Sequence, residues 1–220
     1  MNVETPLGPA RVLRREPDTV GGTLVLGHGA GGGIAAPDLD AVSDAACAAG
    51  WRVLGVEQPW RVAGRRIAPA PPRLDLAWTA VLEQLRSSDA LAGPLVLGGR
   101  SAGARVACRT ASAQGAAGVL ALAFPLHPPG RPEKSRAHEL ALVDVPLLVV
   151  QGETDAFGGP AEVAAAAPHA QVAAVAGDHA LKKDVAAVAA AVLPWLADFS
   201  PKKSPDLSPK RSLSRGGGGR

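Results

Sequence analysis

The sequence predicts an α/β fold in which a mostly parallel sheet carries helices on both faces. Short apolar segments alternate with helix-like segments along most of the 220 residues. The apolar segments are continuous runs of Val, Leu and Ala, which is typical of strands buried on both faces. Their spacing suits repeated strand–helix–strand units. Because sheets of this kind bind ligands beyond the carboxyl ends of their strands, we expect a functional site at that edge.

The expected elements follow one another from residue 20 onward. Strands are expected at 20–28, 51–57, 94–100, 118–125, 146–151 and 170–176, and helices at 37–49, 73–88, 102–114, 160–167 and 184–199. The proline-rich region 126–145 is expected to be irregular. Only about 20 residues separate its flanking strands, which is too few for a lid domain. We therefore expect an open, shallow site.

Length and charge indicate a single folded domain over residues 1–199 and a basic tail over 200–220. The tail holds six Lys or Arg residues and one Asp, so subtracting its charge of +5 from the total of +3 leaves −2 for the domain. A mildly acidic domain gives no argument for nucleic-acid binding. The Ser-, Pro- and Gly-rich tail has too little apolar surface to order itself, so we expect it to be disordered.

Other protein classes find little support in the composition. No apolar run reaches the roughly 18 residues that a membrane-spanning helix needs. The N-terminal segment lacks the basic and apolar pattern of a secretory signal. Cys47 and Cys108 provide no disulfide framework and too few ligands for a cysteine-built metal site. We expect a cytoplasmic protein without a membrane partner, metal or cofactor.

The most informative motif is Gly99-Arg100-Ser101-Ala102-Gly103, which joins an expected strand to an expected helix. In a G-x-S-x-G turn of this kind, the strained backbone lifts the serine hydroxyl clear of the sheet edge. The glycines two positions before and after the serine allow the strand and helix to approach closely. Ser101 is therefore the predicted nucleophile.

A serine nucleophile needs a base, and the base needs a group that orients it. His179 directly follows the last expected strand, at the edge where Ser101 is expected, and is the predicted base. Asp155 follows the strand at 146–151 and is the predicted orienting acid, with Glu153 as the alternative. The chain order of serine, acid and histidine is the one expected for a hydrolase of this architecture.

Acyl transfer also needs N–H donors for the oxyanion of the tetrahedral intermediate. The N–H of Ala102, directly after the nucleophile, is one predicted donor. The glycine-rich loop at 28–33 is expected to supply the second, from Ala30 or alternatively Gly29. The candidate substrate-binding residues near this edge are His28, Arg100 and His127.

The same loop supports a rival interpretation, because Gly27 to Gly32 also satisfy G-x-G-x-x-G. Glu57 ends the next expected strand, where the ribose-binding acid of a dinucleotide site would stand. However, the next helix is expected to start near residue 37, too late for a pyrophosphate site. The chain also has no tyrosine for the proton relay of short-chain dehydrogenases. A nucleotide-binding protein is therefore the less favoured alternative.

These segments together resemble the small, lidless branch of the α/β-hydrolase superfamily. More narrowly, the chain looks like bacterial dienelactone-hydrolase-like proteins related to testis-expressed hydrolase-like proteins and to a histone-acetyltransferase-complex subunit. The resemblance covers about 20–198 and is carried by segments 28–32, 98–105, 124–136, 151–158 and 177–181. It implies that Ser101, Asp155 and His179 act as nucleophile, acid and base. Dienelactone hydrolases use cysteine where this chain has Ser101, so their substrate is not implied.

The sequence therefore predicts a metal-free serine hydrolase that acts through an acyl-enzyme. Small carboxylic esters or thioesters are the expected substrates, because a short lidless chain offers little apolar tunnel for long acyl groups. The alternative is a catalytically silent interaction protein that keeps the same fold.

Overall fold

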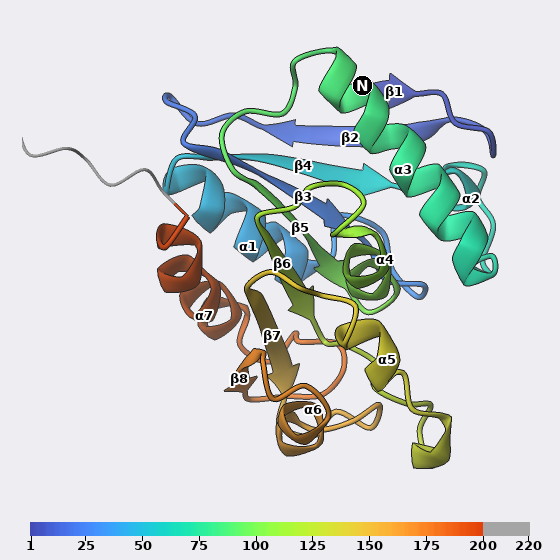
Figure 1. Ribbon diagram of the computed structural model, residues 1–220, viewed down its shortest axis with the longest axis vertical. Helices are drawn as coiled ribbons and strands as arrows, with labels where there is room; N and C mark the ends of the chain where they lie inside the picture. The colour runs from blue at the N-terminus through green and yellow to red at the C-terminus, as the bar shows by residue number, and fades with distance from the viewer. Residues whose placement is uncertain (200–220) are drawn as a thin grey trace, which may run out of the picture.

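The computed structural model describes residues 1–199 as an eight-stranded sheet flanked by helices (Figure 1). The strands are β1 (Asn2–Val3), β2 (Ala10–Arg15), β3 (Gly22–Gly27), β4 (Trp51–Glu57), β5 (Leu95–Arg100), β6 (Gly118–Leu122), β7 (Leu147–Gly152) and β8 (Gln171–Val175). The α-helices are α1 (Pro37–Ala48), α2 (Pro59–Val62), α3 (Pro71–Ser87), α4 (Ala102–Thr110), α5 (Ala137–Leu140), α6 (Pro160–Ala166) and α7 (Val185–Ala197). A 3-10 turn, η1, spans Pro132–Lys134. The expectation of a disordered tail at 200–220 lies outside the described residues.

The sheet is mostly parallel, with an antiparallel edge. Its strand order is β1-β2-β4-β3-β5-β6-β7-β8. The β1–β2 and β2–β4 pairs are antiparallel, and every pair from β4 to β8 is parallel. The predicted fold class is confirmed. The parallel strands all end at the same edge, which is where the loops discussed below emerge.

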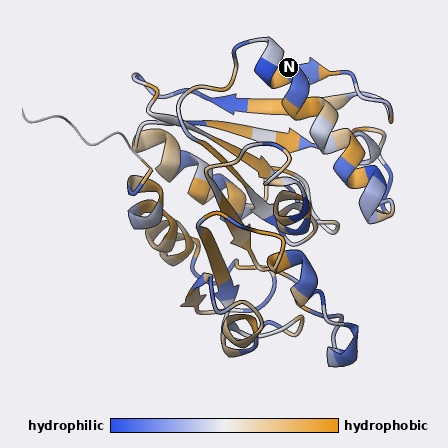
Figure 2. Cartoon of the chain, viewed as in Figure 1, coloured by the Kyte–Doolittle hydropathy of each residue, from blue (hydrophilic) through white to orange (hydrophobic). Residues whose placement is uncertain are grey.

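Helices cover both faces of the sheet, and each face has its own apolar core. Helices α1 and α7 pack against each other on one face, whereas α3, α4, α5 and α6 cover the other (Figure 1). Successive residues of β3 alternate between these cores: Leu24 and Leu26 face α1 and α7, and Val25 faces α3 and α4. Figure 2 shows the hydrophobic colouring along the central strands that this two-sided burial requires.

The structure adds an N-terminal hairpin that the sequence analysis left unassigned. Strand β2 alternates buried and exposed residues, with Ala10 and Val12 buried and Leu13 exposed. This pattern suits an antiparallel strand covered on one face only. Because Arg11, Arg14 and Arg15 occupy the less buried positions, the strand lacks the continuous apolar run by which the other strands were recognised.

Two predicted elements end three or more residues earlier in the structure than expected, and the other predicted boundaries differ by at most two residues. Helix α4 ends at Thr110 rather than at 114, because residues 111–115 form turns and Gly115 has a φ of +62°. Strand β6 ends at Leu122 rather than at 125, because Ala123 leaves the strand with a φ of +46°. The region 126–145 also contains η1 and α5.

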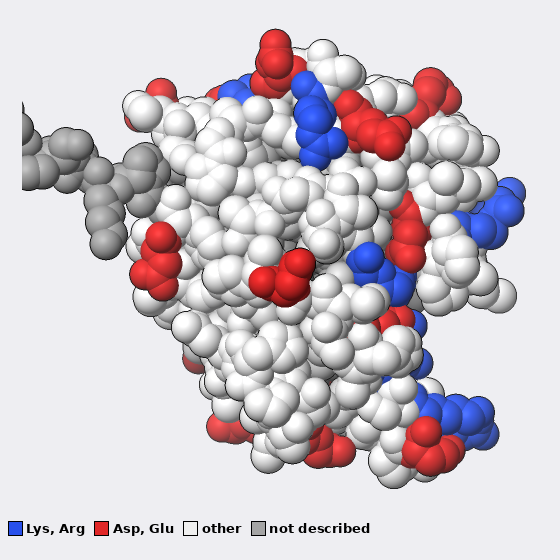
Figure 3. All heavy atoms as spheres, in the orientation of Figure 1, with Lys and Arg blue, Asp and Glu red and all other residues white. Residues whose placement is uncertain are grey.

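The surface carries both signs of charge. On the face shown in Figure 3, acidic and basic side chains are interspersed. Among the helices of residues 1–199, none combines the length and apolar character needed to cross a membrane.

Three glycines bring β3, β5 and α4 into direct backbone contact. A Cβ added to Gly103 would lie 2.5 Å from the carbonyl carbon of Gly27, and one added to Gly99 would lie 2.9 Å from the Gly27 nitrogen. Neither position leaves room for a side chain, because backbone atoms cannot move aside as a flexible side chain can. Helix α4 can therefore start directly against the end of β3.

Replacing Gly103 with Ala should lower the free energy of unfolding by about 2 kcal/mol, because the added methyl group overpacks a backbone contact. The matched control is Gly31→Ala, since nothing lies within 4 Å of a Cβ at that position. Urea denaturation followed by tryptophan fluorescence measures both variants. Equal losses of stability in the two variants would contradict the proposed contact.

Candidate active site

Ser101 occupies a strained turn between β5 and α4. Its φ of +53° and ψ of −107° place it in a region that non-glycine residues seldom adopt. The Ser101 N–H donates to the Leu122 carbonyl at 2.9 Å, and its own carbonyl accepts from the Arg105 N–H at 3.1 Å. The strain is thus held by β6 on one side and by the first turn of α4 on the other. Strain of this kind is concentrated at functional sites.

The structure brings Ser101, His179 and Asp155 into one hydrogen-bonded chain. His179 Nε2 lies 2.9 Å from Ser101 Oγ, and His179 Nδ1 lies 2.8 Å from Asp155 Oδ2. The Asp155 side chain is fully buried, whereas the imidazole is one-fifth exposed. Glu153, the alternative acid in the sequence analysis, is exposed. The imidazole therefore connects a buried carboxylate to the serine hydroxyl.

Gln151 holds the Asp155 carboxylate in place and was missed by the sequence analysis. This fully buried side chain donates from Nε2 to Asp155 Oδ2 at 2.9 Å and to the Gly158 carbonyl at 2.7 Å. Its Oε1 accepts from the Phe124 N–H at 2.9 Å. The Phe157 N–H donates to the other carboxylate oxygen, Oδ1, at 2.8 Å. A polar residue at the end of an otherwise apolar strand was the signal available in the sequence.

The loop that carries His179 is tied to the loop that carries Asp155. Both the N–H and the hydroxyl of Thr154 donate to the Gly177 carbonyl at 3.0 Å. The Phe157 ring packs against the imidazole, with ring centroids 4.2 Å apart and an angle of 31° between the planes. Phe157 was also missed, because only the folded loop shows that it reaches His179. These contacts restrict the imidazole to the orientation that reaches Ser101.

Ser101 and His179 line a pocket of about 620 Å³. The lining includes the glycine-rich loop at 29–33, residues 35–37, Arg100, Phe157 and Lys182. Ala30 belongs to this lining, and Ala102 starts helix α4. Within residues 1–199, neither the Ala30 N–H nor the Ala102 N–H has a hydrogen-bond acceptor, and the same holds for Gly29. Of these residues with unpartnered N–H groups, Gly29 and Ala30 line the pocket, and Ala102 directly follows Ser101 in the chain.

His28 lies outside the lining of that pocket. Its Nδ1 is 2.9 Å from the Gly29 carbonyl, and its Nε2 accepts from the Gln58 N–H at 3.1 Å. The side chain is buried, and burial lowers the pKa of His28 below its ordinary value. Both ring nitrogens thus have protein partners, and they fix the start of the glycine-rich loop.

His127 also lies outside the pocket lining. Its Nδ1 is 3.0 Å from the Pro128 carbonyl and its Nε2 is 3.1 Å from a Glu162 carboxylate oxygen. The hydrogen bond to the Pro128 carbonyl, followed by the one to Glu162, raises the pKa of His127. Its backbone N–H donates to the Phe157 carbonyl at 3.0 Å. His127 therefore supports the loop that follows Asp155.

Arg100 lines the pocket and links two parts of the site. Its Nη2 donates to the His179 carbonyl at 3.1 Å, and its Nε lies 3.3 Å from Asp38 Oδ2. The Asp38 side chain is fully buried, and burial raises the pKa of Asp38, whereas the Arg100 cation opposes that rise. This pair, whose acid the sequence analysis missed, connects the first turn of α1 to the loop that carries His179.

Replacing Arg100 with Met should lower the free energy of unfolding by about 3 kcal/mol at pH 7, because the Asp38 carboxylate would stay buried without its cation. Burial holds the pKa of Asp38 in the folded state above its unfolded value, so the folded state gains protons more readily as the pH falls. The loss of stability should therefore shrink as the pH falls from 7 towards about 4.

Denaturant unfolding of wild type, Arg100→Met and Asp38→Asn/Arg100→Met across this pH range measures the effect. The double variant has no ionisable group at position 38. Its loss of stability relative to the wild type should therefore not shrink as the pH falls, unlike the loss in Arg100→Met. A loss in Arg100→Met that stays constant with pH would contradict the role of Asp38.

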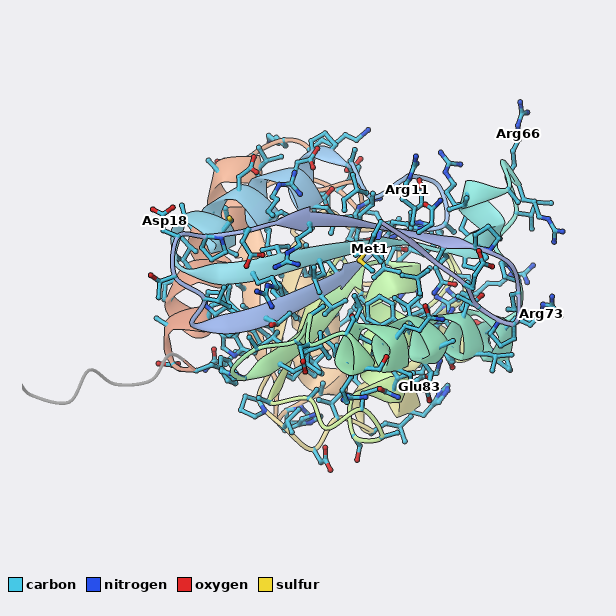
Figure 4. The ribbon with its side chains drawn as sticks, turned by 90° about the horizontal axis from the view of Figure 1, so that it is seen from above. Met1, Arg11, Asp18, Arg66, Arg73 and Glu83 are labelled. Atoms are coloured by element: carbon cyan, nitrogen blue, oxygen red, sulfur yellow. The ribbon has the colours of Figure 1, made fainter. Side chains whose placement is uncertain are left out.

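The acid proposed for a dinucleotide site has another partner. Glu57 pairs with Arg11, whose Nε donates to Glu57 Oε2 at 2.9 Å across the β2–β4 pair. Figure 4 shows Arg11 among the side chains of this N-terminal edge, whereas Arg66 points away from the fold. Helix α1 begins at Pro37, several residues after the last glycine of the motif.

Within residues 1–199, no group of three or more His, Cys, Asp or Glu side chains is arranged to hold a metal ion.

The family follows from the match of residues 21–190 to the alpha/beta hydrolase domain. The match covers most of the 220 residues, and the chain therefore belongs to the alpha/beta hydrolase family. None of the curated proteins compared with the chain matches it.

Solved structures of similar fold include two that are described as α/β serine hydrolases. XC6422 from Xanthomonas campestris, described as an α/β serine hydrolase without a lid, is 19% identical, with a TM-score of 0.75 over 93% of this chain and 95% of that chain. An α/β serine hydrolase homologue from Coxiella burnetii is 17% identical, with a TM-score of 0.76 over 89% and 96%. Est1E from Butyrivibrio proteoclasticus is 14% identical, with a TM-score of 0.76 over 90% and 98%, and has also been solved with ferulic acid bound. At these identities the likeness shows a shared fold.

Proposed function

We propose that this protein is a serine hydrolase that cleaves small carboxylic esters or thioesters through an acyl-enzyme. The observation that carries the proposal is the hydrogen-bonded chain from Ser101 Oγ through the His179 imidazole to the Asp155 carboxylate. A serine hydroxyl becomes a useful nucleophile at neutral pH only when such a base can take its proton.

The geometry supports the usual two-stage acyl transfer. His179 Nε2 takes the Ser101 hydroxyl proton while Oγ attacks the carbonyl carbon of the substrate. The tetrahedral intermediate collapses, His179 gives the proton to the leaving oxygen or sulfur, and the acyl group stays on Ser101. A water molecule then attacks the acyl carbon while His179 takes its proton, and His179 returns that proton to Ser101 Oγ as the acid leaves. Asp155 holds the Nδ1–H tautomer and stabilises the imidazolium that forms in each stage.

Two backbone N–H groups near Ser101 complete the chemistry in this proposal. The N–H of Ala102 lies directly after Ser101 at the start of α4, where the helix dipole favours negative charge. The N–H of Ala30, with Gly29 as the alternative, supplies the second donor from the glycine-rich loop. Each such donor typically contributes about 10²–10³ in rate.

The remaining candidate residues take supporting roles in this proposal. Arg100 positions the loop of His179, His28 fixes the glycine-rich loop and His127 supports the loop that follows Asp155. Two of these assignments replace the expectation that His28 and His127 contact substrate, since neither lines the pocket. The ferulic acid bound to Est1E is a carboxylic acid, and it supports a carboxylic ester as the substrate class.

The alternatives account for less of the structure. A catalytically silent protein gives no reason for a strained serine that meets a buried acid through a histidine. A nucleotide-binding protein is disfavoured because the Glu57 carboxylate already pairs with Arg11. The narrower likeness to dienelactone-hydrolase-like proteins and the cytoplasmic location stay predictions.

A fluorophosphonate probe should label the wild type on Ser101, because the probe traps activated serines. Ser101→Ala and His179→Ala should both lose the label, and their kcat/KM for p-nitrophenyl acetate should fall by about 10⁴-fold or more. The control is Ser112→Ala, which removes an exposed serine from outside the pocket and should label normally. A wild type that shows native circular dichroism but neither labels nor hydrolyses the ester would overturn the proposal.

A further inference from the structure

The pocket around Ser101 is lined by two charged side chains, and both are cationic. Arg100 and Lys182 belong to the lining, and no Asp or Glu does. The other lining residues besides Ser101 and His179 are Gly, Ala, Pro and Phe. An anionic group on a substrate would therefore meet positive charge and no carboxylate among the side chains that line the pocket.

The two cations differ in how they are compensated. Arg100 is paired with Asp38 and also donates to the His179 carbonyl, so its charge is balanced within the fold. Lys182 is exposed and forms no ion pair with a carboxylate among residues 1–199. The Lys182 cation lowers the pKa of Asp38, so these two charges attract each other without forming an ion pair. Within residues 1–199, Lys182 is thus the lining cation whose charge is less compensated than that of Arg100.

The backbone before Lys182 is held firmly, which keeps the lysine near the base. Leu181 is fully buried and has a φ of +52°, and its N–H donates to the Asp178 carbonyl at 3.1 Å. Lys182 thus follows the anchored turn that also carries His179. The flexible side chain can reach a bound group while its base remains fixed.

We propose that Lys182 gives this hydrolase a preference for esters that carry a carboxylate beside the ester group. This inference rests on the proposed function. A pocket of about 620 Å³ has room for an ester with a short chain and a second polar group. Because Lys182 is exposed, water and salt screen the attraction, and the expected effect is about fivefold rather than several orders of magnitude.

Two matched pairs of substrates test the inference. Monoethyl glutarate carries its carboxylate in the acyl part and is compared with ethyl pentanoate. 4-Acetoxybutanoate carries its carboxylate in the alcohol part and is compared with butyl acetate. A pH-stat gives kcat and KM for each ester at low and high salt, with wild type, Lys182→Met and Lys182→Glu. The control is Lys183→Met, which removes the neighbouring exposed lysine outside the pocket lining.

We expect the wild type to favour the charged ester of at least one pair by about fivefold in kcat/KM at low salt. Lys182→Met should abolish this ratio mainly by raising KM for the charged ester, and Lys182→Glu should invert it. Lys183→Met should keep the wild-type ratio, and high salt should reduce the ratio in the wild type. The pair that shows the preference identifies the side of the ester that faces Lys182.

Failure of the inference is distinct from failure of the proposed function. Hydrolysis of both members of each pair, with ratios that Lys182→Met leaves unchanged, would overturn the role of Lys182 and leave the hydrolase intact. No hydrolysis of any of the four esters, by a wild type that also resists the fluorophosphonate probe, would overturn both.

Discussion

The site depends on one steric constraint, the direct contact between the backbone of Gly27 and that of Gly103. Because α4 starts against the end of β3, the chain has to reverse direction within the turn at Ser101, and that residue takes a positive φ. The turn brings the Ser101 hydroxyl to the carboxyl edge of the sheet and leaves the Ala102 N–H without a protein acceptor within residues 1–199. Hydrogen bonds to β6 and within α4 hold the strained backbone.

The parallel sheet supplies the rest of the arrangement. Strands β7 and β8 are neighbours, so the loops that follow them emerge side by side. A Cβ on Gly152 would lie 2.5 Å from the Asp178 carbonyl oxygen, which shows how closely these two loops pack. Polar side chains next to these two loops form hydrogen bonds to them. Gln151 donates to the Asp155 carboxylate, and Arg100, which pairs with Asp38, donates to the His179 carbonyl. Hydrogen bonds act only over short distances. The His179 imidazole therefore stays within reach of Ser101 and Asp155 only while all of these contacts are formed.

Local sequence patterns predicted much of this arrangement, and long-range packing accounts for what they missed. Continuous apolar runs located β3 to β8, and the position after each strand placed Ser101, Asp155 and His179 at one edge, where the structure brings them within hydrogen-bond distance. The sequence did not predict the β1–β2 hairpin, because arginines interrupt the apolar pattern of β2. The sequence could not predict the partners of Gln151 and Asp38, because the contacts of both residues form only when the chain folds.

In the proposed mechanism, Ser101 carries the acyl group between the two stages of hydrolysis. Intact-protein mass spectrometry after rapid acid quenching of the enzyme with p-nitrophenyl acetate, followed by peptide mapping, tests it directly. We expect one added acetyl group per chain on the peptide that contains Ser101, formed at the rate of the initial burst of p-nitrophenol. Turnover with the acetyl group on another residue, or at full rate in Ser101→Ala, would contradict it.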